Sequence, residues 1–158
     1  MIPSTYYKQG AYVPVHKEKY TGTYPIFYRS NPEFLLMRWM DLNPKVVAWA
    51  SESTIVNYKK PSDNKNHRYF IDFSCKFMGD SGKVVNLLIE YKPSKFVKKP
   101  EKTPRLSNKT YAGLCEKWIV NMAKWDAAHR YAKERGAKFV VITEKDLGLN
   151  SLWNAKKL

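Results

Sequence analysis

The stretch from His67 to Lys92 constrains the fold of this 158-residue chain more than any other. Apolar and polar side chains alternate on both sides of the short turn sequence MGDSGK, and a period of two is typical of β-strands. We therefore predict two antiparallel strands joined by a hairpin turn that is centred on Ser81. Because a shift by one residue would mix the two faces of each strand, the alternation also fixes the register. The expected pairs are Phe77 with Val85, Cys75 with Leu87 and Phe73 with Ile89.

This register places Asp72 directly opposite Glu90 on the polar face of the hairpin. Side chains so placed have Cβ atoms about 4.5 to 5.5 Å apart, and two like charges at that distance destabilise the sheet unless they are neutralised. A divalent cation would neutralise them, and carboxylate oxygens favour Mg²⁺ or Mn²⁺, which keep open positions for water and phosphate. Lys92 lies on the same face, within reach of an oxygen bound to such a cation. The pattern of Asp followed by Glu-x-Lys therefore describes a metal-dependent phosphodiesterase site.

Two alternatives stay open when only the residues are considered. Asp72, Glu90 and Lys92 also fit the solvated face of a two-stranded ribbon, with Glu90 and Lys92 as a surface ion pair. Glu33 follows Ser30 by three residues, where a glutamate completes a capping box and interacts favourably with the helix dipole. A carboxylate at this end of a buried helix would equally suit the acidic site.

The charge balance indicates a polyanionic partner. The chain carries 28 Lys and Arg against 14 Asp and Glu, a net charge of +14. A membrane partner is not expected, because no apolar run approaches the roughly 20 residues of a transmembrane helix and the N-terminus lacks the apolar core of a signal peptide. Cys75 and Cys115 are far apart in the sequence and fit small buried side chains in a reducing compartment.

Residues 1–29 are rich in tyrosine and lysine and contain prolines, without a clear period. We predict an extended basic N-terminal arm over the domain, with its tyrosines docked and its lysines outward. Such an arm either follows a nucleic-acid backbone by charge and stacking or simply packs on the domain. A largely buried helix, SNPEFLLMRWMDLN, is expected next, with Ser30 or Asn31 as its N-cap and Asn43-Pro44 ending it.

The segments on either side of the hairpin differ in character. VVAWASE and STIVNYK predict two short strands that meet at Glu52. After Lys92, residues 93–105 form a proline-rich basic loop that begins at the candidate site. We expect the cations of this loop, together with Arg68 of the hairpin, to bind the backbone of a polyanionic substrate, although a charged loop also fits a solvated surface. The loop cations are Lys95, Lys98, Lys99, Lys102 and Arg105.

A long amphipathic helix is predicted from Ser107 or Asn108 to Arg135, where Gly136 closes it. KFVVI, residues 138–142, then predicts a strand that is buried on both faces. Residues 150–158 are expected to form a basic tail. The helix has one apolar stripe that we expect to be buried, formed by Tyr111, Leu114, Cys115, Trp118, Met122, Trp125, Ala128 and Ala132.

The order of these elements resembles that of the PD-(D/E)xK nucleases. The residues that match the nuclease pattern are Glu33, Asp72, Glu90 and Lys92. More narrowly, residues 12–148 are similar to the head completion nucleases of contractile-tailed bacteriophages and, more distantly, to the endonuclease subunit of heteromeric transposases. One departure from the pattern is that Ile71 stands where the PD motif has proline. The stretches that carry the similarity are YRSNPEF, NPKVVAWASE, HRYFIDF, LLIEYKP and KWDAAHRYAKERGAKFVVITEKDL.

This resemblance implies an α/β fold with a restriction-endonuclease-like core, in which helices flank a mixed β-sheet. It implies a nuclease domain over residues 30–149, between the arm (1–29) and the tail (150–158). It also implies that Asp72, Glu90 and the backbone carbonyl of Tyr91 bind Mg²⁺ or Mn²⁺, with Glu33 as a further ligand. Lys92 would orient the attacking water or stabilise charge on the phosphate.

The expected function is that of a metal-dependent DNA endonuclease that acts in phage head completion after DNA packaging. Its implied partners are double-stranded DNA and phage head or portal proteins, and its implied locations are the capsid-associated virion and the host cytoplasm. The alternative is a non-catalytic basic virion protein that binds the DNA end or the portal. A third and weaker possibility is RNA as the substrate, although nothing in the sequence reads a 2′-hydroxyl.

Overall fold

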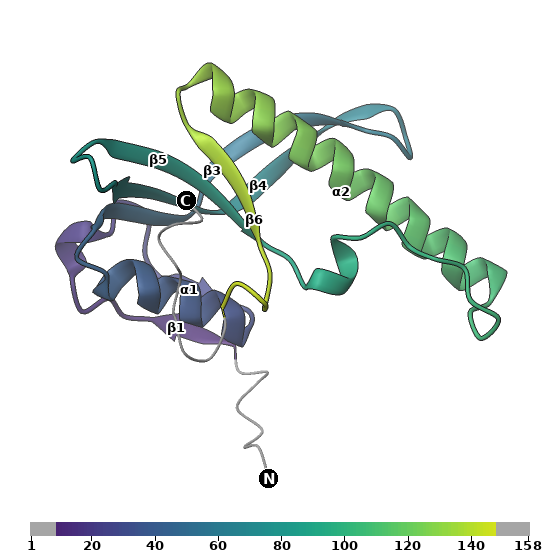
Figure 1. Cartoon of the computed structure of the whole chain (residues 1–158), viewed down its shortest axis with the longest axis horizontal. Coiled ribbons are helices and arrows are strands. Elements are labelled where there is room, and N and C mark those ends of the chain that lie inside the picture. Colours follow the sequence, from purple (N-terminus) through teal and green to yellow (C-terminus); the bar gives the residue numbers. More distant parts are fainter. Residues whose placement is uncertain (1–8, 148–158) are drawn as a thin grey trace, which may run out of the picture.

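A computed structural model describes residues 9–147 as a mixed α/β arrangement of a four-stranded sheet and two helices (Figure 1). The strand order is β3-β4-β5-β6, with β5 and β6 parallel and the other neighbours antiparallel. This arrangement confirms the predicted α/β class and the mixed sheet. In chain order the elements are β1 (Gly10–Tyr12), η2 (Lys17–Lys19), β2 (Ile26–Tyr28), α1 (Asn31–Leu42), β3 (Val46–Lys60), β4 (Lys65–Met78), β5 (Val84–Tyr91), η3 (Ser94–Phe96), α2 (Asn108–Glu134) and β6 (Lys138–Ile142).

The hairpin of β4 and β5 has the predicted register. Gly82 in its turn has a φ of +79°, a left-handed conformation that glycine adopts without strain. The odd-numbered side chains of β4 from Tyr69 to Phe77 are all buried, as the alternation requires. The hairpin therefore supplies a row of buried side chains to the core of the protein. The observed pairs include Phe77 with Val85, Cys75 with Leu87 and Phe73 with Ile89.

The two short strands predicted around Glu52 are in fact one strand, β3, with a bulge. Ser51 pairs with Phe73 and Thr54 pairs with Ile71, so Glu52 and Ser53 together lie opposite the single residue between those partners. Glu52 has a φ of +50°, which is uncommon for a residue with a side chain. The prediction of two strands was wrong because a bulge absorbs the irregular residues without ending the hydrogen-bonded ladder.

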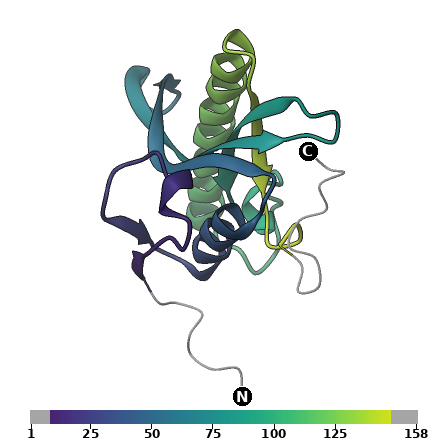
Figure 2. The same ribbon diagram turned by 90° about the vertical axis from the view of Figure 1, so that its left-hand side faces the viewer.

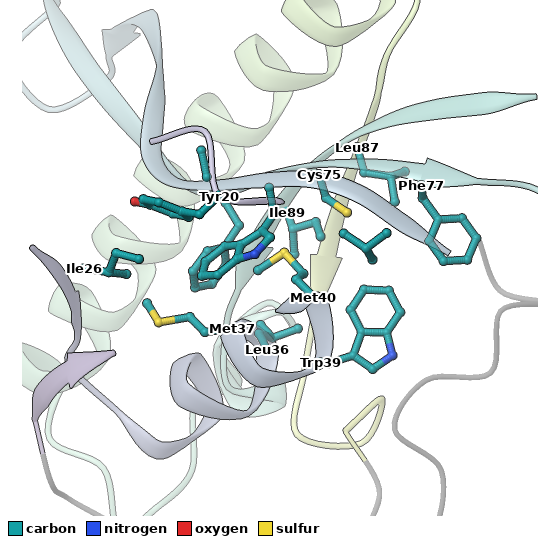
Figure 3. Close-up of a cluster of buried hydrophobic side chains, with 14 of the residues drawn as sticks. Tyr20, Ile26, Leu36, Met37, Trp39, Met40, Cys75, Phe77, Leu87 and Ile89 are labelled. Atoms are coloured by element: carbon teal, nitrogen blue, oxygen red, sulfur yellow. The ribbon is translucent and has the colours of Figure 1, made fainter. Parts of the chain in front are cut away.

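The buried side chains form two separate clusters. Figure 3 shows the first cluster, in which Cys75 and Phe77 of β4 pack with α1, and Phe73 belongs to the same cluster. In the second cluster, Tyr69 and Ile71 pack with α2. The two helices lie apart in Figure 1, and Figure 2 shows the same elements turned by 90°. Since both clusters take side chains from one strand, the packing partner of β4 changes between Ile71 and Phe73.

The first helix, α1, begins and ends where the sequence predicts. The Ser30 hydroxyl accepts a hydrogen bond from the Glu33 N–H at 3.4 Å, and Asn43 is the C-cap. The helix buries its face against the sheet, so it is held by packing as well as by its caps. Its buried residues are Leu36, Met37, Trp39, Met40 and Asp41.

Residues 9–29 are more ordered than the predicted arm. β1 and β2 pair as a two-stranded antiparallel sheet. Tyr12 and Tyr20 are buried in the first cluster, which confirms that these tyrosines dock. Lys19 does not point outward as predicted, because its Nζ donates hydrogen bonds to the backbone carbonyls of Asp41 (3.0 Å) and Asn43 (2.8 Å). Strands of three residues are too short to show a period in the sequence.

Asp41 joins this N-terminal segment to α1 through a buried carboxylate. The Tyr12 hydroxyl and the Val15 N–H donate to Oδ2, each at 2.8 Å, and the His16 N–H donates to Oδ1 at 2.9 Å. Burial alone would raise the pKa of Asp41, but these three hydrogen bonds outweigh it and hold the pKa below its ordinary value. The charged form therefore stabilises the fold.

The second helix, α2, has the predicted bounds, with Ser107 as N-cap and Gly136 at a φ of +65° after its end. The predicted stripe is only partly buried, however. Trp125, Ala128 and Ala132 are fully buried, whereas the predicted stripe residues nearer the N-terminus are half-buried. Figure 1 gives the reason, because this half of the helix extends beyond the sheet.

Two further expectations concern membranes and the C-terminal tail. Within residues 9–147, no helix has the length and apolar character that crossing a membrane requires. The predicted basic tail, residues 150–158, lies outside the described residues.

We predict that Asp41→Ala lowers the free energy of unfolding by about 3 kcal/mol at pH 7, because three buried donors lose a charged acceptor. In the wild type, the stabilisation by the Asp41 carboxylate is fully present above the pKa of a carboxyl group in the unfolded chain. It is lost as the pH falls through the lowered pKa of Asp41 in the native state. Urea unfolding measures both effects. Asp80→Ala is the control, since this exposed residue pairs only with Lys45 and should change stability by less than about 1 kcal/mol. Equal losses in the two variants would contradict the role of Asp41.

Candidate active site

The candidate site lies where β4 and β5 bring two carboxylates together. The observed register, continued by one pair beyond Phe73 and Ile89, places Asp72 opposite Glu90. Asp72 Oδ2 accepts a hydrogen bond from the Tyr91 N–H at 2.9 Å, which fixes this carboxylate against the neighbouring strand. Glu90 is only 6% exposed. The sequence left open that these residues lie on a solvated face of the hairpin. That alternative does not fit Glu90, because its side chain is deeply buried.

The carboxyl groups of Asp72 and Glu90 are both harder to ionise than they would be in water. Burial raises the pKa of Asp72 to about 8, with further increases from the charges of Glu90 and Glu33 and partial offsets from the Tyr91 N–H and Lys92. Burial likewise raises the pKa of Glu90, although Tyr69, Lys92 and Lys124 oppose the shift. A pair of acids with raised pKa values in one place is typical of a functional site.

Lys92 is the cation beside this pair. Its Nζ lies 3.6 Å from Glu90 Oε1, and its side chain is half-buried. The Lys92 N–H donates to the Ile142 carbonyl at 2.8 Å, so the end of β6 fixes the backbone from which this side chain extends. Lys92 is therefore positioned by the parallel pairing of β5 and β6.

The contacts of Glu33 bear on the two roles that the sequence left open. Its Oε2 accepts a hydrogen bond from the Arg29 N–H at 2.8 Å, just before the N-cap Ser30, so its carboxylate is engaged at the start of α1. Its charge is one of the smaller causes of the raised pKa of Asp72. A role as metal ligand stays a prediction.

Three residues near the site were not among the sequence candidates. Arg29 pairs with Glu52 of the β3 bulge, and this contact raises the pKa of Arg29, with smaller effects from the charges of Glu33 and Asp72. Lys124 of α2 is half-buried, and the charges of Glu90 and Asp72 act on it. The sequence gives little signal for either contact, since each depends on elements that are distant along the chain.

The acid pair fits Mg²⁺ or Mn²⁺ in its chemistry. Glu90 Oε2 is buried and has no hydrogen-bond partner, which is costly unless a cation neutralises it. Within residues 9–147, no group of three or more His, Cys, Asp or Glu side chains is close enough to hold a metal. Mg²⁺ does not need such a group, because it is usually bound by one or two carboxylates together with substrate phosphate and water. Two carboxylates such as Asp72 and Glu90 would therefore be enough for this ion.

The predicted DNA-binding cations lie mostly on the loop that leaves this site. Lys95 of η3 has its Nζ 4.9 Å from the centre of the Phe96 ring. Lys102 instead donates to carbonyls of its own loop, at Thr103 and Leu106. The six predicted cations are all exposed and remain available to a polyanion, namely Arg68, Lys95, Lys98, Lys99, Lys102 and Arg105.

Comparison with known proteins decides the family. The family described as TnsA-like endonuclease N terminal matches residues 43–144, more than half of the chain, and this range includes Asp72, Glu90 and Lys92. The chain belongs to this endonuclease family. It is also 37% identical over 142 residues to the head completion nuclease of Enterobacteria phage T4, which covers 87% of this chain and 92% of that relative. No solved structure matches the chain.

This endonuclease homologue should become more stable when one of the paired acids is neutralised. The native pKa of Asp72, about 8, lies above its unfolded value, so the native state holds a proton that the unfolded state releases. Stability of the metal-free protein should therefore fall as the pH rises from about 4 to 8. We predict that Asp72→Asn reduces this fall and raises the free energy of unfolding at pH 8 by roughly 1–3 kcal/mol.

The asparagine side chain keeps an oxygen that accepts from the Tyr91 N–H. Chemical unfolding with EDTA present, at pH 5 and pH 8, gives the measurement. Asp126→Asn is the matched control, because its carboxylate on α2 is exposed and pairs with Arg130 on the surface. A lower stability of Asp72→Asn than of wild type at pH 8 would contradict the prediction, because it would mean that ionised Asp72 does not destabilise the native state.

Proposed function

We propose that this protein is a metal-dependent DNA endonuclease of the PD-(D/E)xK type, with a restriction-endonuclease-like fold. The observation that carries the proposal is the pair of half-buried Asp72 and buried Glu90 with Lys92 beside it. A structural ribbon has no need for two adjoining acids, whereas a divalent cation that promotes phosphodiester hydrolysis is held by such carboxylates. Membership of an endonuclease family supports the same reaction class.

In the proposed mechanism, Asp72 and Glu90 would hold Mg²⁺ or Mn²⁺, with the Tyr91 backbone carbonyl and Glu33 as further ligands. The ion would supply Lewis-acid chemistry and a water of lowered pKa. Lys92 would orient the attacking water and stabilise the negative charge that grows on the phosphate. As the water oxygen forms a bond to phosphorus, the ester P–O bond breaks; the water loses a proton to solvent and the leaving oxygen takes one up from solvent. The backbone contact of Asp72 with Tyr91 keeps one acid in place throughout.

Duplex DNA is the proposed substrate, because the chain has a net charge of +14 and exposed cations beside the site. Contacts to the phosphate backbone dominate such binding, so affinity should be weakly sequence-specific and should fall steeply with salt. By analogy with the T4 relative, the protein would act in phage head completion. Its partners would be head or portal proteins, and it would be found in the virion and in the host cytoplasm.

The decisive experiment is digestion of linear and circular duplex DNA with Mg²⁺ or Mn²⁺. We expect wild type to cut both, while Asp72→Asn loses cleavage because it no longer supports the cation. Lys92→Ala should lose at least about 100-fold in rate, as expected when one donor to a charged transition state is removed. Asp126→Asn, the exposed control on α2, should cut like wild type. Cleavage by Asp72→Asn would exclude the assigned site.

The alternative function is a non-catalytic protein that binds the DNA end or the portal. The high positive charge favours it independently of the acid pair. The same assay separates the two functions, because a binding protein would shift DNA in a gel without metal and give no products on long incubation. Activity only with assembled heads would instead show that the nuclease requires its partner.

The basic loop should contribute to binding through charge alone. We predict that Lys98→Ala with Lys99→Ala weakens DNA binding to a similar extent for all sequences. The slope of log K against log salt concentration should fall by about 2, since two phosphate contacts are lost. Fluorescence anisotropy with a labelled duplex at several salt concentrations measures this slope. Lys133→Ala, an exposed lysine near the end of α2, is the control. An unchanged slope in the double variant would mean that the loop is merely a solvated surface.

A further inference from the structure

The strands β3 and β4 continue past the rest of the sheet and carry an open face there. β5 pairs with β4 over Phe73–Met78, whereas β3 pairs with β4 as far as Lys65. Residues 54–60 and 65–71 therefore form a two-stranded β3–β4 extension (Figure 1). One of its faces packs with α2 in the second cluster. The opposite face, its outer face, is exposed and consists of Ile55, Asn57, Lys59, Asn66, Arg68 and Phe70.

An apolar pair occupies this outer face next to the candidate active site. Ile55 pairs with Phe70 across the two strands, and these residues are 42% and 45% exposed. Asp72 follows Phe70 by two residues, so the alternation of β4 places both side chains on the same side of the strand, about 7 Å apart along it. The outer face is therefore continuous with one of the two acids of the site.

Cations lie beside the apolar pair. The guanidinium carbon of Arg68 is 5.5 Å from the centre of the Phe70 ring. Lys59 is exposed further along the same face. Residues 54–71 contain four Lys or Arg and a single Asp, so the charge of the extension is complementary to a polyanion. An exposed aromatic ring with cations around it is the combination that binds single-stranded nucleic acid, because bases stack on the ring and phosphates contact the cations.

A local structural role explains only part of this arrangement. Apolar pairs across two strands stabilise a sheet, and a cation near an aromatic ring is attracted by it. Neither contact requires that Phe70 stay exposed beside a proposed metal ligand. A phenylalanine ring also offers no hydrogen bond to the phosphates and base edges that a duplex displays. It stacks well, however, on a base that is unpaired.

We propose that the outer face of the β3–β4 extension binds an unpaired base of the DNA substrate near the scissile phosphate. Phe70 is the surface on which this base stacks, and Arg68 contacts a neighbouring phosphate. The inference rests on the proposed function and names the preferred substrate, which is duplex DNA with unpaired nucleotides next to the cut. In a complete duplex the base must first leave its pair, which costs free energy that an unpaired base does not require.

Binding measured with EDTA present tests the inference without cleavage. Fluorescence anisotropy compares two labelled probes, a complete duplex and the same duplex with a gap of unpaired thymines. We expect wild type to bind the gapped probe more tightly. Phe70→Ala should weaken this binding about 5- to 100-fold and change binding of the complete duplex much less. Phe70→Ala should also leave the salt slope unchanged, whereas Arg68→Gln should lower the slope on the gapped probe by about 0.7.

Further variants separate stacking from packing within the extension. Phe70→Tyr keeps a flat ring and should bind both probes like wild type. Phe70→Leu keeps an apolar contact with Ile55 and should bind the gapped probe as weakly as Phe70→Ala. Phe27→Ala is the matched control, because Phe27 is likewise exposed (58%) but lies on β2. Thermal unfolding shows that each variant is folded at the assay temperature.

Three outcomes would overturn the inference. Binding of the gapped probe by Phe70→Leu at the wild-type level would mean that Phe70 only packs within the extension. Equal affinity of wild type for the two probes would mean that no unpaired base is recognised. Wild-type binding of both probes by Phe70→Ala would mean that the outer face does not contact DNA, as expected if it docks a protein instead.

The outcome for the proposed function is separate. Cleavage by wild type and not by Asp72→Asn establishes the nuclease, and in that case wild-type behaviour of Phe70→Leu overturns only the stacking role. If wild type cuts no DNA, the proposed function fails, while a preference for the gapped probe that depends on Phe70 would still support the binding site. Absence of that preference would then overturn the inference as well.

Discussion

The bulge in β3 is the constraint on which the site depends. Glu52 and Ser53 lie opposite a single residue of β4, and that residue is Asp72. A bulge bends its strand and increases the local twist, which accounts for the change of packing partner along β4 at this point. Asp72 therefore lies where the two clusters of buried side chains meet. The positive φ of Glu52 costs about 1–3 kcal/mol, and its ion pair with Arg29 helps to retain it.

The candidate site combines a central pair of acidic residues with basic residues around it. Asp72 is half-buried and Glu90 is buried, and the pKa values of both are raised, so their ionised forms are costly in the free protein. Lys92 Nζ lies 3.6 Å from Glu90 Oε1, and the charge of Asp72 also acts on Lys124 and Arg29. A metal cation with a bound phosphate would place a positive charge against the two acids and a negative charge against the surrounding cations. The same arrangement that costs stability in isolation therefore favours a metal and a polyanion together.

Local patterns predicted the parts of the fold that they control. A period of two fixed the β4–β5 register and thereby the opposition of Asp72 and Glu90, and capping residues located both ends of α1 and α2. The bulge left no such pattern, because the residue at positive φ is a glutamate and not a glycine. Periodicity also showed which face of α2 is apolar, but not how much of it the sheet covers. The packing of α2 on β3 and β6 also brings Lys124 onto the rings of Tyr58 and Tyr69, a contact that no local pattern predicts.

The N-terminal segment is part of the site's support and not an accessory to it. Asp41 fixes the chain at Tyr12, Val15 and His16 against α1. The same segment then ends at Arg29, whose N–H positions Glu33 and whose guanidinium holds the bulge residue Glu52. Because the charge of Glu33 acts on Asp72 and the bulge lies opposite Asp72, the path of residues 9–29 affects the acid pair in two ways. The packing of this segment and the geometry of the site are therefore coupled, even though no residue of the segment carries the proposed chemistry.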